Sequence, residues 1–305
     1  MEMMSNETAK QSRRAVTLGL AAGLLTPVAA MGQERILRGL SRAIDIVQRI
    51  ENVSIDEDDE IAMGEGLFGP LIAESGGRYR NSSVQDAIAR FAQPMFDLSE
   101  RERFAWDVVV LDNNEVNAWS LPGGKLAVNK GLLRYVASED ELAAVLAHEI
   151  GHAELSHVRR EMRKRAFYGE LSNVATTEAI KAIDDNRIDM AIGALQGPMF
   201  RLVTSGYSRE SEDEADLHIV SMFERTGRDV SAGAGFFRTL LELAPRDARR
   251  TTSLFSGHPE TERRLENILA AAPEGPSAPP SPPTEAYAEL KEVFPTRNYY
   301  MRTRA

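Results

Sequence analysis

The sequence predicts an α+β fold that is mainly helical and carries one small antiparallel sheet. Three short stretches, at residues 104–111, 116–121 and 125–129, have strand character, and turn residues separate them. From Ser138 to about Ala272, apolar residues instead recur at helical spacing. A chain of 305 residues that is 43% hydrophobic and 27% charged can bury a substantial core, which favours one domain with appendages.

The first thirty residues have the pattern of an export signal. Arg13 and Arg14 precede an apolar run from Ala15 to Ala30, which is short, rich in Ala and Gly, and ends in small residues. We expect a twin-arginine-like signal peptide over residues 1–30 and a protein that is exported to the periplasm or envelope. An uncleaved N-terminal anchor is the alternative.

Residues 31–80 are expected to form an amphipathic helix and an acidic loop. Apolar residues from Ile36 to Ile50 recur at helical spacing, and the acidic run Asp56–Glu60 follows. The negative run favours packing of this helix on the body of the protein over association with a membrane surface.

The composition narrows the possible partners. A formal net charge of −10 offers no excess of Lys and Arg for phosphate contacts, so we expect no nucleic-acid partner, and nothing indicates an obligate one. The chain has no cysteine, so a transition metal must be held by His, Asp or Glu.

The elements of the main domain, residues 81–272, follow in order. Ser83 and Asp86 are expected to open a helix, and the three strands come next, with Pro122–Gly123–Gly124 as the tight turn before the third. After the helical region, residues 273–305 form a Pro-rich linker and a C-terminal tail, in which 285–294 could be a short helix.

A metal-binding motif lies on the first helix after the sheet. Ser138 and Glu141 form a capping box, and the helix continues through His148-Glu149-Ile150-Gly151-His152. At about 100° per residue, His148 and His152 point to nearly the same side, so both imidazoles can reach one cation. Glu149 is displaced by about 100°, close enough to hydrogen-bond water on that cation.

A catalytic zinc needs a third protein ligand, and the acidic segment Ser208–Asp216 can supply it. Glu212 and Asp216 are four residues apart and share a helix face, so one can ligate the metal while the other orients a histidine. Spacing alone would also allow Glu210 or Glu214. His157 and His218 are expected to lie outside the ligand set.

These motifs resemble the gluzincin family of zinc metallopeptidases that contains the CAAX prenyl proteases, the mitochondrial inner-membrane quality-control protease and the periplasmic protease of outer-membrane assembly. The resemblance covers about residues 83–269. It rests on the His-Glu-x-x-His helix, the Glu-x-x-Ala-Asp segment and three further anchors. The anchors are Asn117-Ala118-Trp119 with Leu121-Pro122-Gly123-Gly124, Gly131-Leu132-Leu133, and Ser256-Gly257-His258-Pro259.

The resemblance implies a zincin-type domain with one Zn²⁺ per chain, held by His148, His152 and Glu212. It implies Glu149 as the general base, and Asp216 remains the residue that orients a histidine ligand. His258 is expected to contact zinc or stabilise the oxyanion, or else to cap the helix that Pro259 begins. The edge strand of the sheet, within 117–121 or 125–129, would border the cleft and bind substrate backbone. The residues expected to bind substrate are Asn117, Ala118, Trp119, Gly123 and Gly124.

The predicted function is therefore a zinc-dependent endopeptidase that cleaves misfolded or unassembled exported proteins. A chaperone-like protein that binds unfolded exported chains without cutting them is the alternative, and a structural metal site is a third interpretation. The loop from Gln196 to Tyr207 is a candidate lid over the cleft.

Overall fold

The structure, a computed structural model, describes residues 55–167, 196–197, 199–204, 206–243, 261–272 and 283–296. The expected signal peptide (1–30), the helix at 33–50, His258 and most of the Pro-rich linker lie outside the described residues. Within the described part, no helix combines the length and hydropathy needed to cross a bilayer.

Two helices precede the sheet. Helix α3 (Glu57–Glu74) begins with a complete capping box, in which Asp56 and Asp59 each accept a hydrogen bond from the other's backbone N–H. Helix α4 (Ser82–Phe96) is capped by Asn81, whose side chain accepts from the N–H of Val84. The second helix therefore begins before Ser83, the residue expected to open it.

The sheet is mixed, so the prediction of an antiparallel sheet was wrong. Strands β1 (Asp107–Leu111), β2 (Ala118–Leu121) and β3 (Lys125–Asn129) are ordered β1-β3-β2. β2 pairs with β3 antiparallel across the tight turn, but β1 pairs with β3 parallel. The segment between β1 and β2 is thus a crossing rather than a hairpin, and β3 is the central strand. β2 is an edge among the described strands.

The sheet separates two hydrophobic clusters. One face packs towards α4 and helix α6 (Glu139–Glu154), and the opposite face packs under α3, where Leu67 and Leu71 are fully buried. The alternation along each strand explains this division, because successive side chains point to opposite faces. The first face carries Val108, Val110, Ala118, Leu126 and Val128, and the second carries Val109, Leu111, Trp119, Leu121 and Ala127.

The tight turn between β2 and β3 is the 3₁₀ helix η1 (Pro122–Gly124). Gly123 and Gly124 both have left-handed backbone angles, with φ of 72° and 79°. A Cβ on Gly123 would lie 2.9 Å from the carbonyl oxygen of Glu60, so glycine allows α3 to pack directly on the turn.

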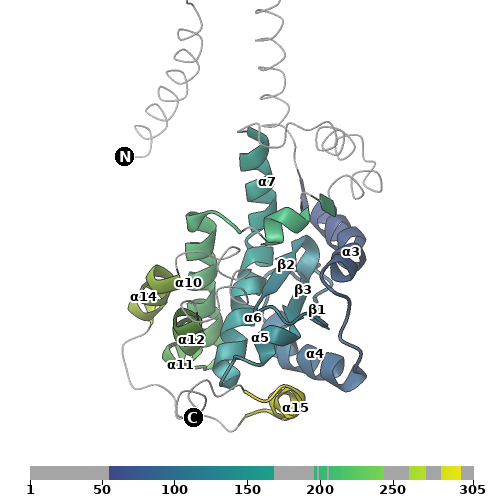
Figure 1. Cartoon of the computed structure of the whole chain (residues 1–305). Helices are drawn as coiled ribbons and strands as arrows, with labels where there is room; N and C mark the ends of the chain where they lie inside the picture. Colours follow the sequence, from purple (N-terminus) through teal and green to yellow (C-terminus); the bar gives the residue numbers. More distant parts are fainter. Residues whose placement is uncertain are drawn as a thin grey trace, which may run out of the picture. The chain divides into compact units, whose positions relative to one another are not determined.

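Most of the remaining helices lie on the side of α6 away from the sheet. Figure 1 shows the sheet beside α6, with α10, α11, α12 and α14 gathered beyond it, and contacts link α6 to α10, α11, α12 and β2. Their bounds are α5 Lys130–Leu133, α7 His157–Phe167, α10 Arg209–Thr226, α11 Val230–Gly233, α12 Gly235–Leu243 and α14 Thr261–Ala271.

The short C-terminal helix is present as α15 (Glu285–Val293), and it packs on α4. Phe294 at its end is fully buried against Tyr79, with ring centroids 5.1 Å apart. Lys291 donates to the carbonyl oxygens of Leu133 and Val136, which follow the sheet. The C-terminal segment therefore contributes to the main core.

Candidate metal centre

Helix α6 holds the motif in a fixed position because nearly all of it is buried. Ser138 accepts a hydrogen bond from the N–H of Glu141, as the capping box predicts. The Glu141 carboxylate accepts from Ala137 instead of Ser138, so only half of the box forms. Every residue of α6 from Glu141 to Ala153 is buried, which fixes the orientation of the histidines by packing on both sides.

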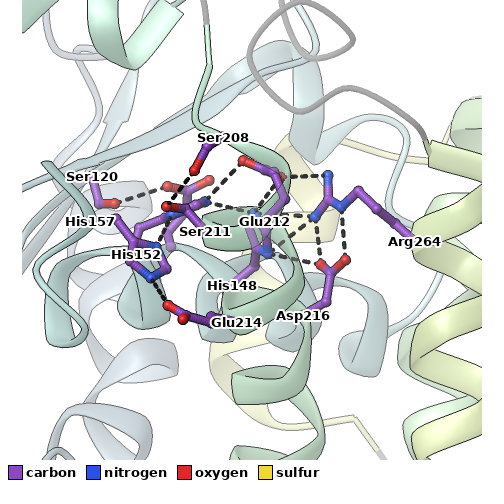
Figure 2. Close-up of polar contacts among 11 residues, drawn as sticks. Ser120, His148, His152, His157, Ser208, Ser211, Glu212, Glu214, Asp216 and Arg264 are labelled. Atoms are coloured by element: carbon purple, nitrogen blue, oxygen red, sulfur yellow. Dashed lines mark hydrogen bonds and ion pairs between the residues drawn. The ribbon is translucent and has the colours of Figure 1, made fainter. Parts of the chain in front are cut away.

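Three side chains from two helices converge at the centre. His148 Nε2 and His152 Nε2 lie 2.9 Å apart, and each lies 3.5 Å from one oxygen of Glu212, on α10. One ligand atom of each residue lies within 4.8 Å of the other two, and all three residues are buried. Figure 2 shows the three side chains pointing towards one another.

The charge of the site fits a divalent cation. Glu149, Glu212 and Asp216 contribute three buried carboxylates, and Arg264 on α14 contributes one buried guanidinium. Three negative charges and one positive charge leave a formal charge of −2. A divalent ion offsets this charge, and unpaired buried charge is costly. Two histidines and one glutamate are also the ligand set of a class of catalytic zinc sites. The described residues therefore fit Zn²⁺.

The pKa of His148 reflects the same electrostatics. Burial and the positive charge of Arg264 lower the pKa of His148. Hydrogen bonds with Asp216 and Glu212 outweigh both effects and raise it to about 9. Without a metal, the cluster thus attracts a proton in place of the cation.

Asp216 and Arg264 surround the convergent atoms. His148 Nδ1 lies 3.1 Å from Asp216 Oδ1, so the aspartate contacts a histidine, as its spacing suggested. Arg264 donates to both oxygens of Asp216, at 2.9 and 2.7 Å, and pairs with Glu212 Oε2 at 3.1 Å. These three contacts of Arg264 fix the positions of Glu212 and Asp216 on one face of α10 (Figure 2).

Arg264 was not predicted from the sequence. The buried residues of α14 are Thr261, Arg264 and Ile268, at helical spacing, so an arginine on the apolar face was the available signal. Ser120 of β2 was also missed, because it falls between the two parts of the anchor, Asn117-Ala118-Trp119 and Leu121-Pro122-Gly123-Gly124. Its hydroxyl contacts the Glu149 carboxylate.

The two alternative carboxylates on α10 lie away from the convergent atoms. Glu210 pairs with Lys164, and Glu214 contacts His157 and Arg160. Among the carboxylates that spacing left open, Glu212 is the one that meets both histidines of the motif.

The other two histidines that the structure describes lie between helices, and His157 is fully buried while His218 is partly buried. His218 contacts the carbonyl oxygen of Ala147 and the carboxylate of Glu154, both at 2.9 Å, and so joins α10 to α6. His157 is fully buried, and its Nδ1 lies 2.7 Å from His152 Nδ1. His157 therefore touches the candidate ligand set from outside.

The residues expected to bind substrate lie along β2 and its turn. Asn117, Ala118 and Trp119 are buried, and the Trp119 ring packs edge-on against Phe68 of α3. Their side chains thus belong to the core. The segment from Gln196 to Tyr207, expected to be a loop that acts as a lid, is helical at residues 196–197 and 199–204. Its Tyr207 is buried with the ring stacked on His152, at 4.0 Å between centroids.

A small apolar cavity of about 30 Å³ adjoins Glu149 and His148. Helix α12 forms one wall of it. The other lining residues are Val145, Phe236, Phe237, Leu240 and Arg264.

Comparison with known proteins defines the class. The model of peptidase family M48 matches residues 78–272, more than half of the chain. The chain therefore belongs to peptidase family M48, which confirms the resemblance seen in the motifs.

Individual relatives share parts of the chain. The metalloprotease YcaL of Escherichia coli is 32% identical over 155 residues, which cover 51% of this chain and 58% of that protein. The beta-barrel assembly-enhancing protease of Yersinia pestis is 26% identical over 254 residues, 81% of this chain and 51% of the relative. The mitochondrial metalloendopeptidase OMA1 of Danio rerio is 29% identical over 216 residues, 70% and 45% of the two chains. The chain spans about half the length of these relatives.

Proposed function

We propose that the chain is a zinc-dependent endopeptidase that hydrolyses peptide bonds in polypeptide substrates. The observation that carries this proposal is the convergence of His148, His152 and Glu212, beside Glu149, in a chain of family M48. In this proposal the three residues hold one Zn²⁺, and Asp216 orients His148 through its Nδ1.

In the proposed mechanism, each residue of the candidate metal centre has its own task. Bound zinc supplies a Lewis acid and lowers the pKa of water at the site towards about 7. Glu149 takes the proton of the attacking water and returns it to the leaving amine. Ser120 holds the Glu149 carboxylate on the side of β2, and Arg264 fixes the positions of Glu212 and Asp216 by pairing with both.

We propose that an extended substrate adds to the edge of β2 by backbone hydrogen bonds. Of Asn117, Ala118 and Trp119, it is Ala118 that would direct its main-chain groups to the free edge, because the Asn117 carbonyl already accepts from Asn129 of β3 and alternate residues face the same side. Gly123 and Gly124 shape the turn that ends the strand. Support comes from the position of β2 directly against α6, with Ser120 in contact with Glu149. His258, outside the described residues, remains a candidate for oxyanion stabilisation.

The proposed physiological substrates are misfolded or unassembled exported proteins. Two observations support this part of the proposal. The first thirty residues have the pattern of an export signal, and one relative is named a beta-barrel assembly-enhancing protease. Periplasmic or envelope localisation is part of the same proposal.

The decisive experiment compares the full chain with its Glu149→Gln variant. We expect about one zinc per chain in both, with cleavage of casein or another unfolded substrate reduced at least about 10³-fold in the variant. Retention of full cleavage by Glu149→Gln would contradict the peptidase mechanism. Zinc binding with suppression of substrate aggregation but no cleavage by the unaltered protein would favour the chaperone-like alternative.

A further inference from the structure

The side of His152 that faces away from the convergent atoms is held by a second histidine. His152 Nδ1 lies 2.7 Å from Nδ1 of His157, and His157 Nε2 lies 3.0 Å from Glu214 Oε2. Arg160 pairs with the same Glu214 oxygen at 2.5 Å. These contacts form a continuous chain from the buried centre to a carboxylate whose side chain is 37% exposed (Figure 2).

The hydrogen-bond directions along this chain follow from one requirement. His152 Nε2 faces His148 and Glu212, so it must be unprotonated to bind a metal, and the ring proton must be on Nδ1. Nδ1–H then donates to His157 Nδ1, which must be unprotonated in turn. The proton of His157 is therefore on Nε2, where it donates to the Glu214 carboxylate. Each link determines the tautomer of the next, and both rings are neutral.

The opposite tautomer of His157 would break the chain at both ends. Two N–H groups would face each other at 2.7 Å, and an unprotonated Nε2 would face a carboxylate oxygen. With the proton on His157 Nε2, both contacts are instead satisfied hydrogen bonds in a buried place, where an unsatisfied polar group is costly.

A break between two consecutive helices brings His157 into this position. Helix α6 ends at Glu154 and α7 begins at His157, with Ser156 between them in a left-handed conformation, φ 54°. This conformation is uncommon for a residue with a side chain. Arg101 holds the Ser156 hydroxyl at 2.5 Å. The corner therefore turns His157 back towards His152 instead of continuing around the helix.

We propose that His157 and Glu214 form an outer relay that positions His152 for zinc. The inference rests on the proposed function and adds two positioning residues to it. The relay is the counterpart of the direct contact between Asp216 and His148, with one additional imidazole between ligand and carboxylate. Partners of this kind fix the orientation of a ligand histidine and raise its basicity, and their loss typically weakens metal binding about 10- to 100-fold.

The test measures zinc affinity by chelator competition in the full chain. His157→Phe keeps a ring but removes both nitrogen atoms, so we expect zinc affinity to fall about 10- to 100-fold. Glu214→Gln should lower it in the same direction. His157→Asn restores an acceptor close to His152 Nδ1, so it should recover part of the loss.

A matched control comes from the other carboxylate–histidine pair. Glu154 of α6 contacts His218 of α10 at 2.9 Å, but His218 touches no candidate ligand through the contacts described. Glu154→Gln should therefore leave zinc affinity within about twofold. The visible absorption bands of the cobalt-substituted protein provide a second measurement, which should change for His157→Phe and not for Glu154→Gln.

Two results would overturn the relay. One is zinc affinity and cobalt bands in His157→Phe equal to those of the unaltered protein. The other is an equal loss in Glu154→Gln and Glu214→Gln, which would assign the effect to helix packing. Failure of the proposed function is distinguishable, because the unaltered protein would then bind no zinc or cleave no substrate in the same series.

Discussion

The hydroxyl of Ser120 donates a hydrogen bond of 3.0 Å to Oε2 of Glu149, and both residues are buried. One residue belongs to the edge strand and the other to the helix that carries the metal-binding motif. The contact therefore ties the proposed general base to the strand proposed to bind substrate.

We predict that Ser120→Ala lowers kcat about fivefold with little change in KM. A single hydrogen bond is worth about 1 kcal/mol, and its loss leaves the Glu149 carboxylate less well oriented. Ser120→Thr keeps the hydroxyl and should retain most of the activity. Steady-state kinetics on a peptide substrate measures both values. An unchanged kcat in Ser120→Ala would show that other contacts suffice to orient Glu149.

Arg264 should be a major determinant of stability in the metal-free protein. Its side chain is almost fully buried and pairs with Asp216 and Glu212, so Arg264→Leu leaves two carboxylates without their cation. We expect the free energy of unfolding to fall by about 3 kcal/mol. The measurement is urea denaturation in the presence of a chelator.

The neighbouring Arg263 provides the control for that experiment. It pairs with Asp213 at 2.7 Å, but both side chains are more than a third exposed, so solvent screens the pair. Arg263→Leu should change the free energy of unfolding by less than about 1 kcal/mol. Equal losses in the two variants would contradict the importance assigned to burial.

The C-terminal helix should stabilise the whole domain. Phe294 is fully buried against Tyr79, and Phe294→Ala is expected to cost about 3–5 kcal/mol. The adjacent Val293 is 37% exposed, so Val293→Ala should cost much less. Thermal and urea unfolding of the two variants measures the difference. Similar stabilities would mean that α15 is not part of the cooperative unit.

Lys291 should make stability depend on alkaline pH. Burial lowers the pKa of Lys291 to about 8, against an opposing effect of Glu141. Between pH 8 and the ordinary lysine value of 10.5, the unfolded chain therefore binds more protons than the folded one, and stability rises with pH.

The comparison is with Lys291→Met, which keeps Glu141, Glu139 and Tyr287 around the site. As the pH rises from 7 to about 9.5, the unaltered protein should gain stability relative to the variant. The upper limit avoids the titration of Tyr287, whose pKa is raised first by burial and then by the two glutamates. A difference in melting temperature that stays constant with pH would refute this assignment.

Local signals in the sequence were sufficient to predict the helix that carries the His-Glu-x-x-His motif. Ser138 fixes its beginning, and the spacing of His148 and His152 follows from helix geometry alone. The order of the strands in the sheet could not be predicted from such local signals. Whether β1 pairs with β2 or β3 depends on the path of the six residues that follow β1, and turn residues there looked like a hairpin.

The outer contacts of the centre depend on tertiary structure. On a continuous helix, His157 would lie about 140° from His152, and that geometry placed it outside the site. The left-handed residue at the break is Ser156. Gly and Asn are the residues that usually adopt this conformation, and neither occurs there to indicate it in the sequence. Arg264 reaches the centre from a helix almost fifty residues beyond Glu212, so neighbouring sequence could not reveal the contact.

Helix α3 lies before the segment that matches the family, residues 78–272, and α15 lies after it. Yet α3 packs on one face of the sheet, and its Glu60 shares Arg101 with the corner at Ser156. A fragment cut to the limits of recognisable similarity would expose that face to water and release the corner behind His152. The contacts that support the candidate metal centre therefore reach beyond the matched segment, to α3 on one side and α15 on the other.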